Sequence, residues 1–153
     1  MGQQQLLLLV LSTVIVGLAT VAGIQAFGEN QQQATQDALI QRATSIGSDI
    51  AAAAQQPSQL GGINLGDSED SDGKSAVASA IGLSSASGIS ASGAGNNAVC
   101  KISSVGTSTV TVKCDSDAGS ESGSYDSSGQ TITVTVTPAN DEPVEVTSIN
   151  VSS

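Results

Sequence analysis

The sequence predicts an α+β protein in which one long N-terminal helix, over about residues 3–56, packs against a small antiparallel sheet. A run of 22 uncharged residues, Leu6–Phe27, begins almost at the start of the chain. From residue 98 onward, apolar residues recur at every second position, which is the period of a strand. The chain therefore divides into a hydrophobic helix over 1–28, its amphipathic continuation over 29–56, a Gly/Ser/Asp-rich loop region over 57–97 and a β domain over 98–153.

The composition argues against nucleic-acid binding and catalysis. The formal net charge is −10, and the only cations are Arg42, Lys74, Lys101 and Lys113. Nucleic acid requires a basic surface, and anionic lipid requires a cluster of Lys and Arg beside the membrane segment. The chain has no His, and its only aromatic residues are Phe27 and Tyr125. Since no residue set suits a nucleophile or a tuned general base, we expect neither an enzyme nor a cofactor site.

The apolar segment Leu6–Phe27 has three competing interpretations. As a helix, its 22 residues measure roughly 33 Å, enough to cross a bilayer core. A secretory signal peptide, cut near Ala26, would have a basic start and a shorter apolar run. A permanent transmembrane anchor fits the length, although Gly17 and Gly23 make the segment less apolar than most anchors. The third interpretation is a helix that enters the membrane temporarily and then packs against copies of itself.

The helix is expected to continue through residues 29–56 with one apolar face. That face collects five residues at spacings of three and four, and we expect it to pack against the sheet: Leu39, Ala43, Ile46, Ile50 and Ala53. No Pro precedes Pro57, which is expected to end the helix together with Gly61 and Gly62. The alternative is two helices hinged at Gly28.

Residues 57–97 are rich in Gly, Ser, Ala and Asp, which predicts a loop with at most a short helical turn near Ser75–Ile81. An acidic run inside this region has the outline of a calcium loop, since aligning Gly73 with the turn glycine places Asp70 and Asp72 at ligand positions. Serines stand where the first Asp and the bidentate Glu of such a loop belong. A solvated acidic loop is the competing interpretation, and no other metal site is expected.

The two cysteines, Cys100 and Cys114, are expected to close a β-hairpin. Pairing them across antiparallel strands predicts the rest of the register, namely Ile102 opposite Val112, Ser104 opposite Val110 and a turn at Gly106-Thr107-Ser108. A zinc site would need carboxylates as its remaining ligands because the chain has no His, so a disulfide is favoured. A disulfide in turn indicates an oxidising compartment outside the cytoplasm.

Two further strands complete a sheet of about four strands. TITVTVT alternates with Ile132, Val134 and Val136 inward, and VEVTSINV follows a turn bracketed by prolines. Asn150 begins the sequence Asn-Val-Ser, which is a glycosylation site only if the source cell modifies Asn. The many Ser and Thr residues are equally open to O-linked sugars.

The layout resembles type IV pilins and their pseudopilin relatives. The likeness consists of the uncharged helical half at Leu6–Phe27, the amphipathic continuation, the Gly/Ser-rich loop and the disulfide-containing sheet. It covers the whole chain as an architecture, and only the first 30 residues as a sequence pattern. The resemblance implies that subunits are held in the cytoplasmic membrane before assembly. It also implies processing by a prepilin peptidase and an assembly machinery with a motor ATPase, which builds the subunits into an extracellular helical homopolymer.

In that family the N-terminal helices form the filament core. The resemblance therefore assigns subunit packing to Gln3, Gln4, Gln5, Leu6, Leu7, Leu8, Leu9, Val10, Leu11, Val14, Ile15, Val16, Gly17, Leu18, Val21, Gly23, Ile24 and Phe27. The two glycines are either contact points for close helix packing, which we favour, or sites of local unwinding.

One feature of the family is missing from the first residues. Pilins usually carry Glu at the fifth mature position, where it pairs with the N-terminal amine of a neighbour. Here that position is Leu7 if cleavage follows Gly2, and Gln5 if Met1 is the first residue. Because a buried unpaired ammonium is costly, we expect the amide carbonyls of residues 3–5 to accept its hydrogen bonds instead.

The leading expectation is the major subunit of an extracellular pilus-like filament for adhesion, surface attachment or motility. The first alternative is a membrane-anchored surface protein that never polymerises and whose Ser/Thr/Gly-rich body forms a stalk or adhesin. The second is a minor pseudopilin of a secretion system.

Overall fold

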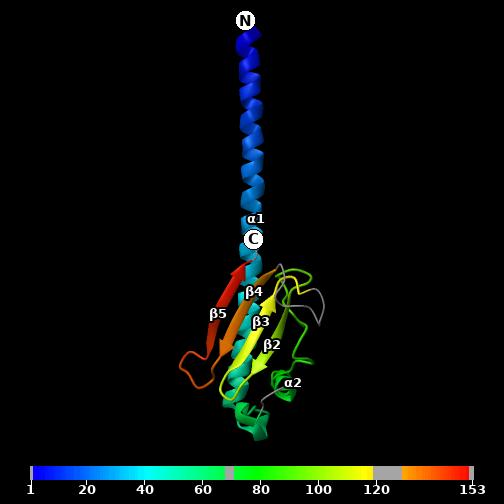
Figure 1. Cartoon of the computed structure of the whole chain (residues 1–153), viewed down its shortest axis with the longest axis vertical. Coiled ribbons are helices and arrows are strands. Elements are labelled where there is room, and N and C mark those ends of the chain that lie inside the picture. Colours follow the sequence, from blue (N-terminus) through cyan, green and yellow to red (C-terminus); the bar gives the residue numbers. More distant parts are fainter. Residues whose placement is uncertain (1, 68–70, 119–128, 152–153) are drawn as a thin grey trace. The chain divides into compact units, whose positions relative to one another are not determined.

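The computed structural model describes residues 2–67, 71–118 and 129–151. Helix α1 spans Gly2–Gln55, and the chain continues through η1 (Ser58–Leu60), η2 (Leu65–Asp67) and α2 (Ser71–Ala80). Five strands follow, which are β1 (Ile89–Ser90), β2 (Val99–Val105), β3 (Val110–Asp115), β4 (Gln130–Val136) and β5 (Val144–Val151) (Figure 1). The predicted α+β class, with a long apolar N-terminal helix and an antiparallel sheet, is confirmed. The chain forms two compact units, Met1–Ala34 and Thr35–Ser153.

Helix α1 has no break at Gly28, so the hinged pair of helices does not form there. Its end is fixed by the chain that follows. The N–H of Ile63 donates to the carbonyl of Ala53 at 3.1 Å, and the N–H of Gly62 donates to that of Pro57 at 3.2 Å. A Cβ at Gly62 would collide with the backbone carbonyl of Gln56, so only glycine allows this close return of the chain.

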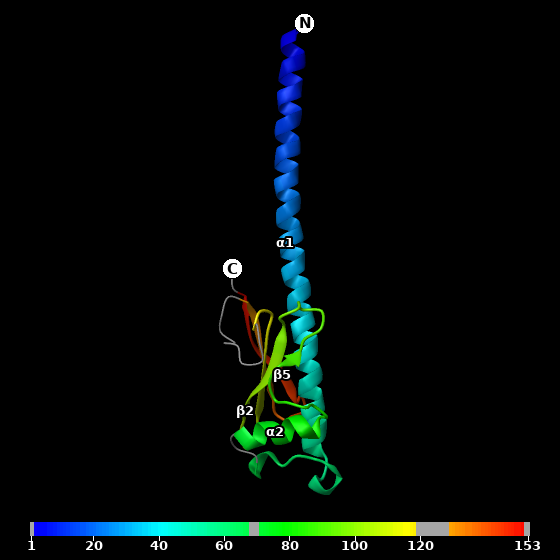
Figure 2. The ribbon, with the colours of Figure 1, turned by 90° about the vertical axis from the view of Figure 1, so that its right-hand side faces the viewer.

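The core of the Thr35–Ser153 unit lies between α1 and one face of the sheet. The strands follow in the order β1-β2-β3-β4-β5, each antiparallel to its neighbour, and the C-terminal part of α1 runs along them (Figure 2). All five residues of the expected helix face are buried, with at most 6% of their surface exposed. The first four of them share one cluster with residues of the strands: Cys100, Ile102, Val110, Val112, Cys114, Ile132, Val134 and Val136.

The β2–β3 hairpin forms as predicted at its open end. Cys100 lies opposite Cys114, Ile102 lies opposite Val112, and the two cysteines are joined in a disulfide. Both cysteines are fully buried against α1. The covalent link therefore joins the two strands inside the core and not at its margin.

Near the turn, a β-bulge in β2 makes the predicted register wrong. The pairing shifts between Ile102 and Ser104, so that Ser104 lies opposite Thr111 and Val105 opposite Val110. A bulge reverses the alternation of faces beyond it. As a result Val105 is 8% exposed while Ser104 is exposed. The extra residue therefore directs the side chain of Val105, and not that of Ser104, into the core.

Residues 57–97 contain more regular structure than expected. The predicted short turn is a ten-residue helix, α2, whose Val77 and Ala78 are buried in the core cluster. Strand β1 pairs Ile89 with Cys100 and raises the number of strands to five. The loop before β1 also joins the sheet, because the carbonyl of Ala86 accepts a hydrogen bond from the N–H of Ile102 at 2.8 Å.

Strand β5 differs from the other strands in its burial. Apart from Val144, every described residue of β5 is exposed, although its valines and isoleucine pair with inward-facing residues of β4. Val146, Ile149 and Val151 keep 38%, 46% and 45% of their surface exposed. The β5 edge is therefore an apolar margin of the sheet that α1 leaves uncovered.

Candidate functional site

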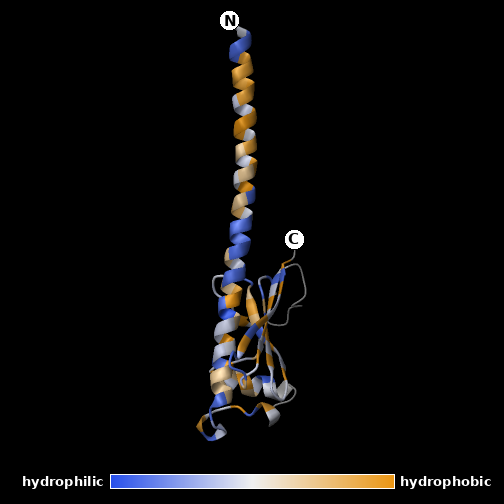
Figure 3. Ribbon diagram, turned by 90° about the vertical axis from the view of Figure 1, so that its left-hand side faces the viewer, coloured by the Kyte–Doolittle hydropathy of each residue, from blue (hydrophilic) through white to orange (hydrophobic). Residues whose placement is uncertain are grey.

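Residues 2–34 carry the largest exposed apolar surface among the described residues. Every one of them is exposed, and the large apolar side chains between Leu6 and Phe27 keep 51% to 74% of their surface open. Figure 3 shows this stretch as hydrophobic almost throughout, with hydrophilic residues at its start and after it. Apolar surface on this scale marks contact with another protein or with a membrane. This surface is the candidate functional site.

The site is apolar around the whole circumference of the helix. By length and composition, α1 contains a stretch able to cross a membrane. A helix that packs one side on a soluble core shows a polar stripe opposite the apolar one, and this stretch has none. It therefore needs an apolar environment on every side, which a bilayer or a bundle of like helices supplies.

The hydroxyl groups within the site are satisfied by their own helix. Ser12, Thr13 and Thr20 donate to backbone carbonyls three residues earlier, at 2.9, 2.8 and 2.8 Å. An unsatisfied hydroxyl in hydrocarbon would cost several kcal/mol, about the penalty of any unpaired polar group there. These side chains therefore do not prevent the helix from entering an apolar environment.

The two glycines of the site lie on open helix surface. A Cβ at Gly17 or Gly23 would meet nothing within 4 Å. Small residues at such positions let a second helix approach closely. In a bilayer, where no hydrophobic effect drives helices together, such close packing is what makes them associate. The surface therefore suits helix–helix contact as well as lipid contact.

The first turn of α1 carries amides and no acidic residue. Gln3, Gln4 and Gln5 are all exposed. The first N–H groups of any helix lack intrahelical partners and form the positive end of its dipole. Amide side chains there can accept hydrogen bonds from an amine without adding a charge.

Comparisons with models of protein families, with curated proteins and with solved structures found no match.

The calcium-loop interpretation gains no support from the backbone. Asp72 and Gly73 lie in α2 and not in a loop, and Asp70 lies outside the described residues. Within residues 2–67, 71–118 and 129–151, no group of three or more His, Cys, Asp or Glu side chains is placed to hold a metal ion. Asn150 is exposed in β5, while Ser152 of its sequon lies outside the described residues.

The end of β3 carries a buried carboxylate that the sequence pattern did not single out. Asp115 is fully buried, and its Oδ1 accepts the N–H of Asp117 at 2.9 Å. The Oγ of Ser116 accepts the N–H of Gln130 at 2.8 Å. Gly129 lies so close that a Cβ there would come within 2.6 Å of Asp115 Oδ1. These contacts fix the chain where β3 ends and β4 begins.

The structure also brings together cations that the sequence leaves scattered. Lys101 and Lys113 are directly opposite each other in the β2–β3 pair, and Lys74 lines a pocket with Lys101. The sequence contained the information for the Lys101–Lys113 pair, since each lysine adjoins a cysteine and the register predicted from the disulfide places them opposite each other.

Proposed function

We propose that this chain is the structural subunit of an extracellular, pilus-like filament that polymerises through residues 3–27 of α1 and serves adhesion, surface attachment or motility. The observation that carries the proposal is the exposed, all-round apolar surface of Leu6–Phe27. Such a surface is not stable in water, so the subunit passes from a membrane into a polymer without exposing it.

Lipid tails are as apolar as leucine, so the hydrophobic effect does not favour a helix bundle over lipid. Van der Waals contact at small residues, where helices pack closely, provides the favourable free energy. Gly17 and Gly23 offer open contact points, and the hydroxyls of Ser12, Thr13 and Thr20 are already bonded to the helix. These three hydroxyls therefore stay satisfied when a neighbouring helix replaces lipid.

The remainder of the chain suits the outer surface of a fibre. The Thr35–Ser153 unit has a buried disulfide, which fits an oxidising compartment. The net charge of −10 for the chain favours solubility and keeps separate fibres apart. The role is structural, with no catalytic step assigned to any residue.

The second candidate is a membrane-anchored surface protein that stays monomeric, and the membrane-length stretch of α1 alone favours it. It differs from the first in requiring no contact between helices. A minor pseudopilin of a secretion system would share the helix contact but occur in few copies.

Electron microscopy of negatively stained material sheared from the cell surface, with peptide identification, tests the proposal. Uniform thin fibres in which this chain is the main protein are expected. Recovery of the chain only as a monomer after detergent extraction, with no fibres, would replace the proposal with the anchored surface protein. Fibres that contain the chain in trace amounts would indicate the minor pseudopilin.

A further inference from the structure

Strand β5 carries three apolar side chains on the face of the sheet that packs on α1. Two of them lie opposite Ile132 and Val134 of β4, which are fully buried in the core. The three side chains are nevertheless exposed, and outside residues 6–27 the only other exposed large hydrophobic side chain among the described residues is that of Leu60. We name the three residues the β5 margin: Val146, Ile149 and Val151.

The width of the sheet explains why α1 leaves the β5 margin uncovered. Neighbouring strands lie about 4.8 Å apart, so a sheet of five strands is about 19 Å wide, whereas a helix with its side chains is about 10 Å across. At the β2 side, α2 adds cover through Val77 and Ala78, which are buried in the core cluster. At the β5 side, α1 reaches Val144 at Gly47, and no described element covers the residues that follow. The β5 side of this face therefore has room for a second helix.

The helix that suits this place is the apolar segment of another copy. Contact between two Thr35–Ser153 units is opposed by charge, because each unit carries nine of the ten net negative charges of its chain. Residues 6–27 carry no charge, and β5 carries none after Glu145. An approach of the apolar helix to the β5 margin therefore brings two uncharged, apolar surfaces together.

The C-terminal end of the apolar segment carries its most exposed side chains. Ile24 and Phe27 each keep 74% of their surface exposed, more than any other large apolar residue between positions 6 and 27. The two residues are three positions apart and so share one face of the helix. Aromatic side chains contribute large buried areas at protein interfaces. Phe27 is therefore the side chain of the segment that gains most from a partner.

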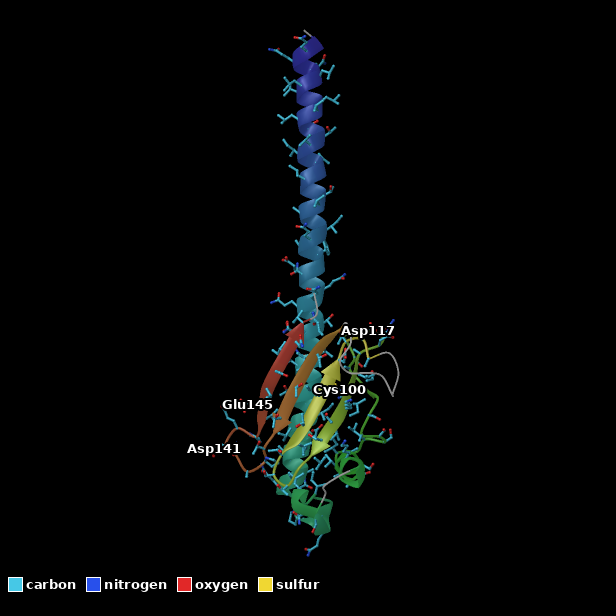
Figure 4. The ribbon with its side chains drawn as sticks, viewed as in Figure 1. Cys100, Asp117, Asp141 and Glu145 are labelled. Carbon is cyan, nitrogen blue, oxygen red and sulfur yellow. A yellow bond between two sulfur atoms is a disulfide. The ribbon has the colours of Figure 1, made fainter. Side chains whose placement is uncertain are left out.

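The charges near β5 limit where Phe27 can bind. Figure 4 shows Asp141 and Glu145 beside the start of the strand. Glu29 lies two residues after Phe27 in α1, and like charges repel it from that acidic end of β5. The uncharged second half of the strand, around Ile149, is therefore the part of the margin that suits Phe27.

We propose that Phe27 of one copy packs on the β5 margin of a neighbouring copy, against Ile149. This inference rests on the proposed function as a filament subunit, and it adds to the helix–helix contact a second contact between the helix of one copy and the sheet of another. Two different surfaces of the subunit meet, so the contact is head-to-tail and continues from copy to copy, as a helical polymer requires. The contact also covers an apolar edge strand that would otherwise be exposed on the fibre.

Disulfide crosslinking in purified fibres tests the contact. The variant is Phe27→Cys with Ile149→Cys in the full chain, whose two native cysteines are already joined and buried. Fibres are expected to form, because a thiol is itself a small apolar group and the rest of the helix contact is unchanged. Mild oxidation is expected to give a ladder of covalent oligomers, since each copy would be linked to the next.

Two matched variants control for chance collision of thiols. Gln25→Cys with Ile149→Cys moves the helix thiol by two residues, which is about 200° around the helix. Phe27→Cys with Ser148→Cys moves the strand thiol to the other face of the sheet, because Ser148 lies opposite Thr133 and not opposite a buried residue. Neither control is expected to give a ladder.

Carboxylates placed on the β5 margin test its contribution to assembly. Ile149→Asp with Val151→Asp changes two exposed positions and is expected to lower the yield of sheared fibres at least about tenfold, equivalent to about 1.4 kcal/mol at the contact. Ser148→Asp with Asn150→Asp makes the same change of net charge at exposed positions on the other face of β5. This control is expected to keep the yield within about threefold of that of the unaltered chain.

The results separate this contact from the proposed function. Fibres of normal yield from the Ile149→Asp and Val151→Asp variant, or a crosslinked ladder no stronger than in the controls, would overturn the contact and leave the proposed function intact. An equal loss of fibres from the two Asp variants would also overturn it, because net charge alone would then explain the loss. Absence of fibres from the unaltered chain would overturn the proposed function and the contact together.

Discussion

Gly47 of α1 lies against Val144 of β5: a Cβ at position 47 would come within 3.0 Å of Val144 Cγ1 and 3.2 Å of Val136 Cγ2. Contacts of 3.0–3.2 Å are tighter than nine in ten real Cβ contacts, so a side chain at position 47 requires these valines to move by a few tenths of an ångström. The glycine therefore sets how closely the helix approaches the last two strands. It also explains why Val144 alone of the described β5 residues is partly covered.

Replacing Gly47 with Leu is expected to destabilise the protein by about 2 kcal/mol or more, since overpacking costs exceed the gain in helix propensity. Thermal unfolding of the full chain in detergent measures the change. Gly28→Leu is the matched control, because nothing lies within 4 Å of a Cβ there, and it is expected to stabilise α1 slightly. Equal melting temperatures for the two variants would show that the helix does not pack on Val144.

Removing the disulfide is expected to cost about 3 kcal/mol, mainly through the loop-closure entropy of the unfolded chain. Cys100→Ala with Cys114→Ala makes the change at two fully buried positions. Denaturant unfolding measures it. Reduction of the unaltered protein separates the crosslink from the side chains and should give most of the loss. A reduced protein as stable as the oxidised one would contradict the prediction.

Gly129→Ala is expected to lower stability by about 1–3 kcal/mol, because the added methyl would overlap Asp115 Oδ1 and crowd Ser116 Oγ at 2.9 Å. The comparison is Gly106→Ala at the other end of β3, where a Cβ would have only ordinary contacts at 3.5 Å. The denaturant midpoints of the two variants compare their stabilities. Equal midpoints would mean that the backbone at Asp115 shifts to accommodate the methyl group at little cost.

Replacing Gln3, Gln4 and Gln5 with Ala is expected to abolish fibres, because the N-terminal amine would be buried without acceptors. The same helix supplies a control, since Gln31, Gln32 and Gln33 form a second run of three amides outside the apolar segment. Their replacement by Ala should leave fibres in normal amount. Unaltered fibres from the first variant would remove the proposed role of the amides.

Enlarging Gly17 to Leu is expected to reduce fibre yield at least about tenfold while leaving membrane insertion intact. Gly28→Leu is the control, because it makes the same substitution on open helix surface outside residues 3–27. Fractionation of sheared material and membranes measures both quantities. If both variants polymerise normally, close packing at Gly17 has no part in assembly.

Periodicity predicted most of the fold correctly, because two different periods occupy different parts of the chain. The spacing of Leu39, Ala43 and Ile46 identified the buried helix face, and the two cysteines fixed the register of β2 with β3. Where local pattern and tertiary packing disagree, the pattern failed. The bulge before Val105 is an example, since strict alternation would have turned Ser104 inward.

The regions that the sequence did not predict depend on contacts between distant residues. The helix over residues 71–80 depends on the burial of Val77 and Ala78 against the core. Strand β1 has only two residues and exists because β2 offers it an edge. Composition alone predicted the apolar helix of the candidate site, whereas the pocket shared by Lys74 and Lys101 required the fold to bring α2 beside β2.

Electron cryomicroscopy of purified fibres, with helical reconstruction, locates residues 6–27 within the fibre. If the apolar helix drives polymerisation, residues 6–27 lie around the fibre axis, each helix surrounded by helices of other copies, with the Thr35–Ser153 units outside. Fibres held together only by the Thr35–Ser153 units, with residues 6–27 directed away from the axis or embedded in lipid, would contradict it.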